Sequence, residues 1–543
     1  MNIFKNPFFY SSTFNFLIVL SLLLAGLYSF SGVFFGLDFT DSFYHLNQAL
    51  NPADGIFLYP FFLSSVIIKW LIELAGTNIF NLRVINWLLL VTSMFLPFIF
   101  LKVKSKWSVI ILYFTFTLIL YAPFNANILG YDTLSILINS LLFALTALYL
   151  KDRKNYLIIL LAIFAAMAIM IRLPNILTVP VIFIFILVSE RINNGKWEVS
   201  NFLKPLGFLI STFLITIAGF ALYYDSWKQF HAASSNADSH HLLSLFLKYL
   251  QDVIKIFGYI VLLLAGRFVY QRSNMKTVNF LNEGLLIVFF LLSLYFLVGV
   301  SKFSANYSHF LVAIAISLVA VQIAFYKGKR NTFRYLILYL FLFFLFIYPL
   351  GSNTGLLKAY SLLLLLPFVI SLHELENRNY WLILLLVLIP FSIITKLFGV
   401  YEDKNMLALN TKLEIEELSP VYTNFIRQDY LQKTDVLVQQ LNSQGVEVFF
   451  YGDKSHIFHF LYPATSLNIS SFFQPVDDPD FFREFSEDLK YKDKIAVFIV
   501  NSYPENSPAP VSLLEMEIMN AGFKKVEDES LRYYLRTPNN ENK

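Results

Sequence analysis

The sequence lacks cysteine and has few charged residues. None of its 543 residues is Cys, and only 14% are Asp, Glu, Lys or Arg. The absence of cysteine excludes disulfides, thiol nucleophiles, iron–sulfur clusters and zinc sites built on thiolates. Water-soluble domains are about 25% charged. The low charge therefore excludes an ordinary soluble protein, and the composition also excludes a disordered chain, a fibrous repeat and a nucleic-acid binder.

Hydrophobic residues dominate instead, and the charged residues are unevenly distributed. The chain is 57% hydrophobic and 18% aromatic. Residues 1–400 carry 27 Lys and Arg against 14 Asp and Glu, whereas residues 401–543 carry 14 against 23. We therefore expect two domains. Residues 1–400 would form an α-helical polytopic membrane body, and residues 401–543 an acidic, water-facing domain.

Apolar runs of about 20 residues, the length that crosses a bilayer, recur along the body. The run 14–34 lacks a small-x-small cleavage site and many runs follow it, which favours a retained span over a signal peptide. The run 57–75 contains Lys69 and Glu73, which favours an interfacial helix. About thirteen predicted spans remain, at 14–34, 80–101, 107–122, 133–150, 156–171, 175–189, 205–222, 250–270, 280–299, 309–326, 335–350, 356–372 and 380–398.

The basic residues indicate an orientation for these spans. With the N-terminus inside, about 18 of the 27 basic residues of the body fall in inner loops, at every second loop. An odd number of spans then places residues 401–543 outside. The pattern predicts a multi-pass protein of the bacterial inner (plasma) membrane, with a cytoplasmic N-terminus and a periplasmic or extracytoplasmic C-terminal domain.

The C-terminal domain alternates strand and helix patterns. The segments 446–451, 495–500 and 530–537 read as strands. Helical patterns occur at about 426–443, 453–461, 479–490 and 511–521. This alternation predicts a small α/β layer with a parallel core. Neither GxGxxG nor a P-loop occurs, so we expect a cap or an acceptor-binding domain without catalysis of its own. His456 and His459 are expected on a surface helix.

Two acids in the first outer loop are candidates for a general base. Asp38 and Asp41 lie three residues apart and share one face of a helical turn. An acid at a membrane boundary beside aromatic residues can have a raised pKa and accept a proton. The alternative is that one of them caps a helix at 42–50. Tyr44 and His45 follow in the same loop and are candidate substrate-binding residues.

Four cations depart from the positive-inside pattern, because the predicted topology places them on the outer side. They are Arg83, Arg172, Lys302 and Lys358. Phosphate capture is one reason to keep them there, and snorkelling or pairing with an acid is the alternative. Arg172 is the strongest candidate, because it lies beside a proline break in an apolar stretch.

Further candidates are weaker. Asp132 opens the fourth span and is either an acceptor-side acid or a helix cap, and His309 at the tenth span could contact a donor. The loop 223–241 could bind a divalent metal, but it holds no histidine pair at i, i+4, which favours a solvated loop. We therefore assign no metal ligand and leave a divalent metal cofactor open. The loop residues concerned are His231, Asp238, His240 and His241.

The order of these elements resembles the GT-C superfamily of polytopic glycosyltransferases, notably its aminoarabinose transferase and protein O-mannosyltransferase branch. In that branch the first outer loop carries an Asp-Glu pair followed by Tyr. Here Asp41 and Tyr44 occupy similar places, while Thr40 replaces one acid and Asp38 precedes it, which leaves open which Asp is the base. Three later segments resemble other elements of the superfamily. The segment 130–134 resembles a Pro-Asp-x-Leu element, 170–174 an Arg-Pro break, and 351–358 a late loop near the donor.

The resemblance implies a sugar donor on a polyprenyl phosphate, or less often a diphosphate, and a glycan, lipid or protein acceptor. It implies an inverting displacement with Asp41 or Asp38 as base and the outer cations at the donor phosphate. The surroundings would be membrane lipid, with no nucleic acid. An oligosaccharide polymerase or ligase and a non-catalytic scaffold are alternatives. A lipid transporter ranks below them, because mid-span charges and repeats are scarce. If the chain is an enzyme, one outer-facing cavity should be lined by Asp41 or Asp38, Arg172 and Lys358.

Overall fold

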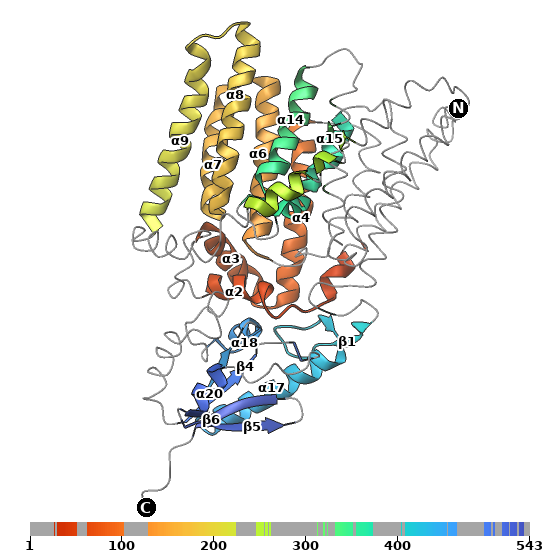
Figure 1. The fold of residues 1–543 in the computed structure, drawn as a ribbon, viewed down its shortest axis with the longest axis vertical. Helices are drawn as coiled ribbons and strands as arrows, with labels where there is room; N and C mark the ends of the chain where they lie inside the picture. Colours follow the sequence, from red (N-terminus) through yellow and green to blue (C-terminus); the bar gives the residue numbers. More distant parts are fainter. Residues whose placement is uncertain are drawn as a thin grey trace, which may run out of the picture.

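The computed structural model of residues 1–543 consists of a helical body and a C-terminal α/β unit (Figure 1). The described residues are 30–50, 62–102, 129–223, most of 246–261, 332–350, 355–372, 408–452, 454–463, 494–500, 513–520, 522–528 and 531–536, with a few isolated positions. The predicted spans 107–122, 280–299 and 380–398, nearly all of 309–326, most of 14–34 and part of 250–270 lie outside them. So do the predicted helix 479–490 and most of the loop 223–241.

Four helical stretches in the described residues are long and apolar enough to cross a membrane. They are α4 (Ile79–Leu101), α6 (Tyr131–Asp152), Leu173–Asn194 and Ser200–Ala221, of which the last two include α8 (Thr178–Asn194) and most of α9 (Ser200–Tyr223). Two shorter apolar helices, α7 (Asn155–Ile171) and α14 (Thr332–Ile347), accompany them. The chain therefore has the helices of a membrane protein.

A side-chain cap starts α4, and a glycine ends α8. The side chain of Asn78 accepts a hydrogen bond from the backbone N–H of Phe80 at 2.9 Å, which starts α4. α8 ends at Gly195, whose φ of 76° is the left-handed conformation that glycine adopts without strain. α7 ends at Arg172, and a 3-10 turn, η6 (Leu173–Leu177), with proline in its first positions, follows directly. This break separates α7 from α8.

α6 lies at the centre of the described body (Figure 1). It packs against α4, α7, α8 and α14. Its Phe143 is fully buried and contacts three phenylalanine rings edge to face, Phe341 and Phe344 of α14 and Phe368 of α15 (Leu366–Leu372). At the far end of the body, Tyr149 donates to Glu190 at 2.5 Å and Lys204 pairs with the same carboxylate at 3.0 Å.

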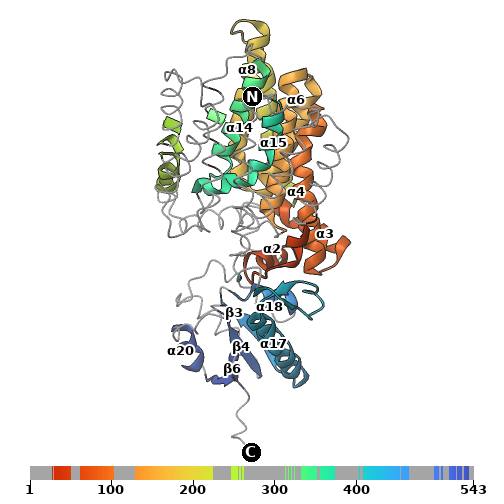
Figure 2. The same ribbon diagram turned by 90° about the vertical axis from the view of Figure 1, so that its right-hand side faces the viewer.

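Short elements occupy the end of the body that faces the α/β unit, here called the junction. They are η3 (Gly32–Phe34), α2 (Asp41–Leu50), α3 (Phe62–Ala75) and the start of η9 (Gly355–Leu365). α2 and α3 lie between the bundle and the α/β unit in both views (Figures 1 and 2). α3 has 14 residues, about 20 Å of helix, too short to cross a bilayer. It exposes Lys69 and Trp70, in keeping with the predicted interfacial helix.

The α/β unit is built on a four-stranded sheet in the order β3-β4-β6-β5. β3 (Glu447–Tyr451) and β4 (Ile495–Ile499) are parallel, whereas β6 (Leu531–Arg536) is antiparallel to β4 and to β5 (Lys524–Asp528). The predicted parallel core is therefore one strand pair within a mixed sheet. β5 was missed, because its sequence KKVED is an exposed edge strand without an apolar run.

Alternating residues of β3 and β4 sort to two faces. Val448 and Phe450 share a core cluster with α17 (Phe425–Ser443), and Phe449 and Tyr451 share another with α20 (Leu513–Asn520). The result is a helix on each face of the sheet. A two-stranded ladder, β1 (Thr411–Lys412) with β2 (Tyr422–Thr423), completes the unit.

The expectation of a surface helix at His456 and His459 was wrong. Both residues belong to α18 (His456–Leu461), and they are 3% and 8% exposed. α18 packs against α2 of the body. α18 lies between the body and its own sheet: His456 faces Tyr44 of α2, and the Nε2 atom of His459 lies 2.8 Å from the carbonyl oxygen of Phe450 on β3. The local pattern did not show this long-range packing.

Candidate functional site

Four side chains from distant parts of the sequence meet at the junction around Asp132. We call Asp132, Lys358, Arg172 and His45 the junction cluster. Lys358, on η9, forms an ion pair with the Oδ2 atom of Asp132 on the first turn of α6. Both side chains are largely buried, at 11% and 16% exposed. A buried ion pair costs desolvation energy and contributes little net stability, so its position at the end of a spanning helix suggests a functional role.

Asp132 does not cap α6 as the alternative interpretation required. Gly130 is the N-cap residue of that helix, and Asp132 directs its carboxylate to Lys358. The Oδ1 atom of Asp132 is buried and has no hydrogen-bond donor among the described residues. The carboxylate therefore retains a lone pair for a ligand or a water molecule.

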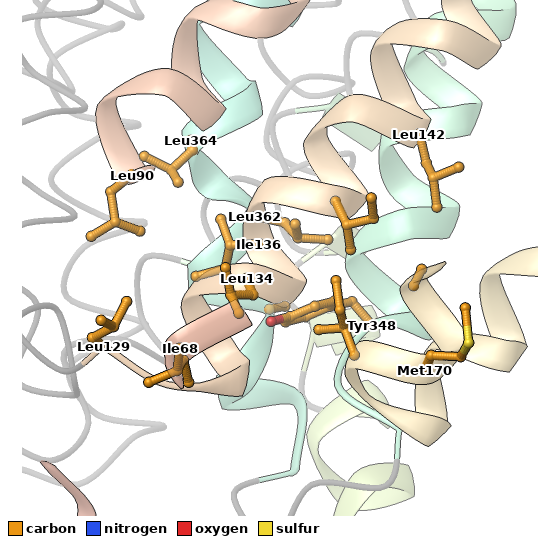
Figure 3. Close-up of a cluster of buried hydrophobic side chains, with 14 of the residues drawn as sticks. Ile68, Leu90, Leu129, Leu134, Ile136, Leu142, Met170, Tyr348, Leu362 and Leu364 are labelled. Atoms are coloured by element: carbon orange, nitrogen blue, oxygen red, sulfur yellow. The ribbon is translucent and has the colours of Figure 1, made fainter. Parts of the chain in front are cut away.

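Arg172 reaches the cluster because α7 ends there. Its extended backbone at the α7–η6 break brings the guanidinium to the junction, where it is 4% exposed. Its Nη1 atom donates to the carbonyl oxygen of Tyr348 at 3.0 Å, and the guanidinium carbon lies 5.4 Å from the centre of the same tyrosine ring. Figure 3 shows that ring among apolar side chains such as Leu134 and Leu362. Apolar packing thus fixes the support on which Arg172 lies.

His45, on α2, completes the cluster as a neutral group. Its ring contacts those of Tyr44 and Tyr131 at 5.2 and 4.7 Å between centroids. Burial lowers the pKa of His45 to about 4, and the nearby Lys358 lowers it too, while Asp132 and Asp38 act in the opposite direction. At neutral pH the imidazole is therefore uncharged. It can donate one hydrogen bond and accept another.

Asp38 carries the hydrogen bonds that start α2. Its Oδ2 atom accepts from the backbone of Ser42 at 2.8 Å. Its Oδ1 atom accepts from the backbone and the hydroxyl of Thr40, at 3.0 and 2.7 Å, and from the Tyr503 hydroxyl at 3.1 Å. This is the helix-start role that is the alternative to catalysis for the two acids. Asp41 is the first residue of α2, and its side chain lies outside the described ones.

The other predicted residues lie apart from the cluster or outside the described residues. Arg83 is buried and donates to the carbonyls of Val33 and Gly36, at 3.2 and 2.7 Å, so it holds the chain that enters α2. Tyr44 lies against His456 of the α/β unit, 5.3 Å between ring centres. The remaining predicted residues, Lys302, His309 and the histidines of the loop 223–241, are not among the described ones.

Two residues of the α/β unit that the sequence analysis did not select also reach this region, Arg427 and Tyr503. Arg427 is 1% exposed and occupies the buried stripe of α17, together with Leu431, Thr434, Val438 and Leu441. That helical spacing is visible in the sequence and could have identified an arginine on an apolar face. Tyr503 follows β4 and carries no comparable signal.

The described residues contain no group of three or more His, Asp or Glu that could hold a metal ion. Comparisons with models of protein families and with curated proteins find no match to the chain. The functional argument therefore rests on the residues of the junction.

Proposed function

We propose that this chain is an integral-membrane glycosyltransferase. It would transfer a sugar from a polyprenyl-phosphate donor to an acceptor hydroxyl at the outer face of the membrane. The observation that supports this most is the meeting of Arg172 and Lys358 around Asp132 at the junction. These cations stand at the ends of apolar helices, at the level where a lipid phosphate would lie.

The charge of the cluster favours one class of donor. Arg172 and Lys358 supply two positive charges and Asp132 one negative charge, while His45 is neutral. The net charge is one positive. A sugar linked through a polyprenyl monophosphate is a phosphodiester with a single negative charge, which this cluster would neutralise. A diphosphate carries more negative charge, which would stay uncompensated in a buried site at a substantial cost.

The reaction would be a single displacement that inverts the anomeric centre. A carboxylate removes the proton of the acceptor hydroxyl, the acceptor oxygen bonds to the anomeric carbon, and the bond from that carbon to the phosphate oxygen breaks. Lys358 and Arg172 stabilise the negative charge on the departing polyprenyl phosphate. Asp38 already accepts from four donors, so Asp41, the first residue of α2, is the favoured base.

The distribution of basic residues supports an outward-facing site. The C-terminal ends of α4, α6 and α8 and the N-terminal end of α9 lie on the side of the body far from the α/β unit (Figure 1). Basic residues gather at those ends, which by the positive-inside rule would face the cytoplasm. The junction and the α/β unit would then face outward. The basic residues at the far end are Lys102, Lys151, Arg153, Lys154, Arg191, Lys196 and Lys204.

The test combines a deletion strain with a purified enzyme assay. Complementation with wild type, Asp41→Asn, Asp38→Asn, Arg172→Ala and Lys358→Ala is compared by mass spectrometry of envelope glycans and of lipid-linked sugars. Lys196→Ala, at an exposed far-end site, is the matched cation control. We expect Arg172→Ala and Asp41→Asn to abolish the glycan modification while the lipid-linked sugar accumulates. Full restoration by both Asp variants would refute the catalytic proposal.

The purified protein then identifies the donor. It is incubated with polyprenyl monophosphate and polyprenyl diphosphate sugars in separate reactions. Release of polyprenyl phosphate from the first alone supports the proposal. Turnover of the diphosphate alone would favour a polymerase or ligase, and transport of the intact lipid without transfer would favour a transporter.

A further inference from the structure

The chain from Gly36 to Asn47, here called the first loop, is held by the α/β unit along its whole length. Gly36 N donates to Tyr422 O at 2.9 Å, and Leu37 N donates to Asp403 Oδ2 at 3.1 Å. Further along, Phe39 O accepts from Ile457 N at 3.2 Å, and Asn47 Nδ2 donates to His456 O at 2.8 Å. These bonds lie on both sides of Asp41. The α/β unit therefore fixes the start of α2 through contacts that lie before and after it in the chain.

Arg427 is the centre of this contact. Its Nη1 atom donates to the carbonyl oxygen of Leu37, and it lies 3.7 Å from the Asp403 carboxylate, which compensates its buried charge. Its guanidinium lies 3.9 Å from the centre of the Tyr503 ring and 5.4 Å from that of Phe39. One buried cation thus contacts the loop backbone, a loop side chain and the neighbouring tyrosine.

Tyr503 transmits this contact to Asp38. Lys454 lies 4.6 Å from the centre of the Tyr503 ring, on which Arg427 also stacks, so two cations fix the ring. The Tyr503 hydroxyl then donates to Asp38 Oδ1 at 3.1 Å, and Asp38 Oδ2 accepts from the backbone N–H of Ser42. A continuous chain of contacts therefore runs from Arg427 to the first turn of α2.

The edge of the sheet that makes these contacts is the one that α/β folds use for ligands. Lys454 and Tyr503 follow the carboxyl ends of the parallel strands β3 and β4. In open α/β sheets that edge is where ligands bind. Here the edge is directed at the first loop of the body.

We propose that the α/β unit positions the catalytic loop, with Arg427 and Tyr503 as positioning residues. They act through Leu37 and Asp38 on Asp41, at the first position of α2. The inference deepens the proposed function and depends on it for the role of Asp41. The contact between the α/β unit and the loop can be tested without any enzyme assay.

The first test uses the absence of native cysteine, which makes a single introduced thiol a clean probe. Ser42 is 3% exposed and its hydroxyl has no hydrogen-bond partner among the described residues. Ser42→Cys is therefore a mild substitution in the full chain. We measure its rate of reaction with a maleimide in detergent, alone and combined with Arg427→Ala. Lys433→Ala, on an exposed position of the same helix, is the matched control, and exposed Ser443→Cys reports the reagent's full reactivity.

We expect Arg427→Ala to raise the labelling rate at position 42 by about tenfold or more, since the loop would open locally without global unfolding. Lys433→Ala should leave the rate unchanged. An unchanged rate in Arg427→Ala would overturn the inference. A raised rate in a protein whose wild type transfers no sugar would instead refute the proposed function while the positioning contact stands.

The second test separates positioning from folding. Tyr503→Phe keeps the ring in contact with Arg427 and Lys454 and removes only the hydroxyl that reaches Asp38, whereas Tyr503→Ala removes both ring and hydroxyl. We expect Tyr503→Phe to retain the low labelling rate and the donor KM, because Ser42 stays buried. We expect it to lower kcat about tenfold through a small shift of the start of α2. Wild-type kcat in Tyr503→Phe would exclude Tyr503 as a positioning residue.

Discussion

His45 lies against Gly130 so closely that a Cβ atom built on Gly130 would stand 2.7 Å from the imidazole Cδ2. The two residues come from α2 and from the start of α6, so this contact sets the distance between the first loop and Asp132. A side chain at position 130 would push α2 away from the start of α6, where Asp132 pairs with Lys358.

Gly130→Ala should therefore destabilise the junction. The His45 ring is half-buried and lies against the rings of Tyr44 and Tyr131, which limit its movement. We therefore expect a loss of about 1–3 kcal/mol in unfolding free energy, as for other overpacked sites. The melting temperature in detergent measures it. Gly207→Ala is the control, because a Cβ there meets nothing within 4 Å. Equal melting temperatures for the two variants would contradict the described packing of His45.

The ion pair of Asp132 and Lys358 should behave as a coupled unit. Lys358→Met or Asp132→Asn alone changes one member of a buried ion pair, and removing one partner of such a pair costs about 3–5 kcal/mol. The double variant removes both charges and should recover most of the stability. A double-mutant cycle of thermal unfolding checks this. Transfer activity should be absent in all three variants. Full activity in the double variant would exclude these charges from the donor site.

The junction should weaken in acid. Burial lowers the pKa of His456 to about 3, with His459, His45 and Lys454 lowering it further, and the pKa of His45 is about 4. The unfolded chain binds a proton on each near pH 6.5, so unfolding takes up protons below that value. Stability should fall by about 1.4 kcal/mol per pH unit for each histidine as the pH drops from about 6.5 toward these folded-state values.

Melting temperatures between pH 7.5 and 4.5 measure this slope. His456→Phe keeps an aromatic ring against Tyr44 but cannot be protonated, so its slope should be shallower than that of wild type. A slope that His456→Phe leaves unchanged would show that His456 does not carry the pH dependence.

Asn78 should serve two functions that substitution can separate. Its Oδ1 atom caps α4, and its Nδ2 atom donates to the carbonyls of Glu416 and Ser419 in the α/β unit, both at 2.8 Å. Asn78→Ala loses both and should cost about 1–2 kcal/mol. Asn78→Asp keeps the cap, but it replaces the amide donors with a carboxylate oxygen that faces the same two carbonyls. If the Asp variant melts like the Ala variant, the bonds to the α/β unit dominate, and if it melts like wild type, the cap does.

Most of the described helices could be predicted from the sequence, because their signal is local. The apolar runs that predicted spans at 80–101, 133–150, 175–189 and 205–222 correspond to α4, α6, α8 and α9. A bilayer requires a long apolar helix with all backbone groups bonded internally, so composition over 20 residues is enough. The strands β3, β4 and β6 were found for a similar reason, since each carries a run of β-branched or aromatic residues.

The site was predictable only residue by residue. Arg172 and Lys358 were selected as cations in unusual places, and the structure brings both to Asp132. The ion pair itself could not be read from the sequence, because it joins residues separated by 226 positions. Arg427 was missed, although its spacing in α17 places it on the apolar stripe, because an arginine in a polar helix is usually exposed. Its contacts with Leu37 and Asp403 compensate the buried charge.

The sequence by itself determined that the body is apolar and helical, that a chemically distinct α/β unit follows it, and which acids and cations are unusual. Each of these follows from local composition and periodicity. The tertiary structure alone decided that Asp38 starts a helix, that Asp132 forms an ion pair with Lys358, and that α18 and Arg427 hold the first loop. Those outcomes depend on which distant groups compensate a buried charge or carbonyl, and burial makes that choice energetically decisive.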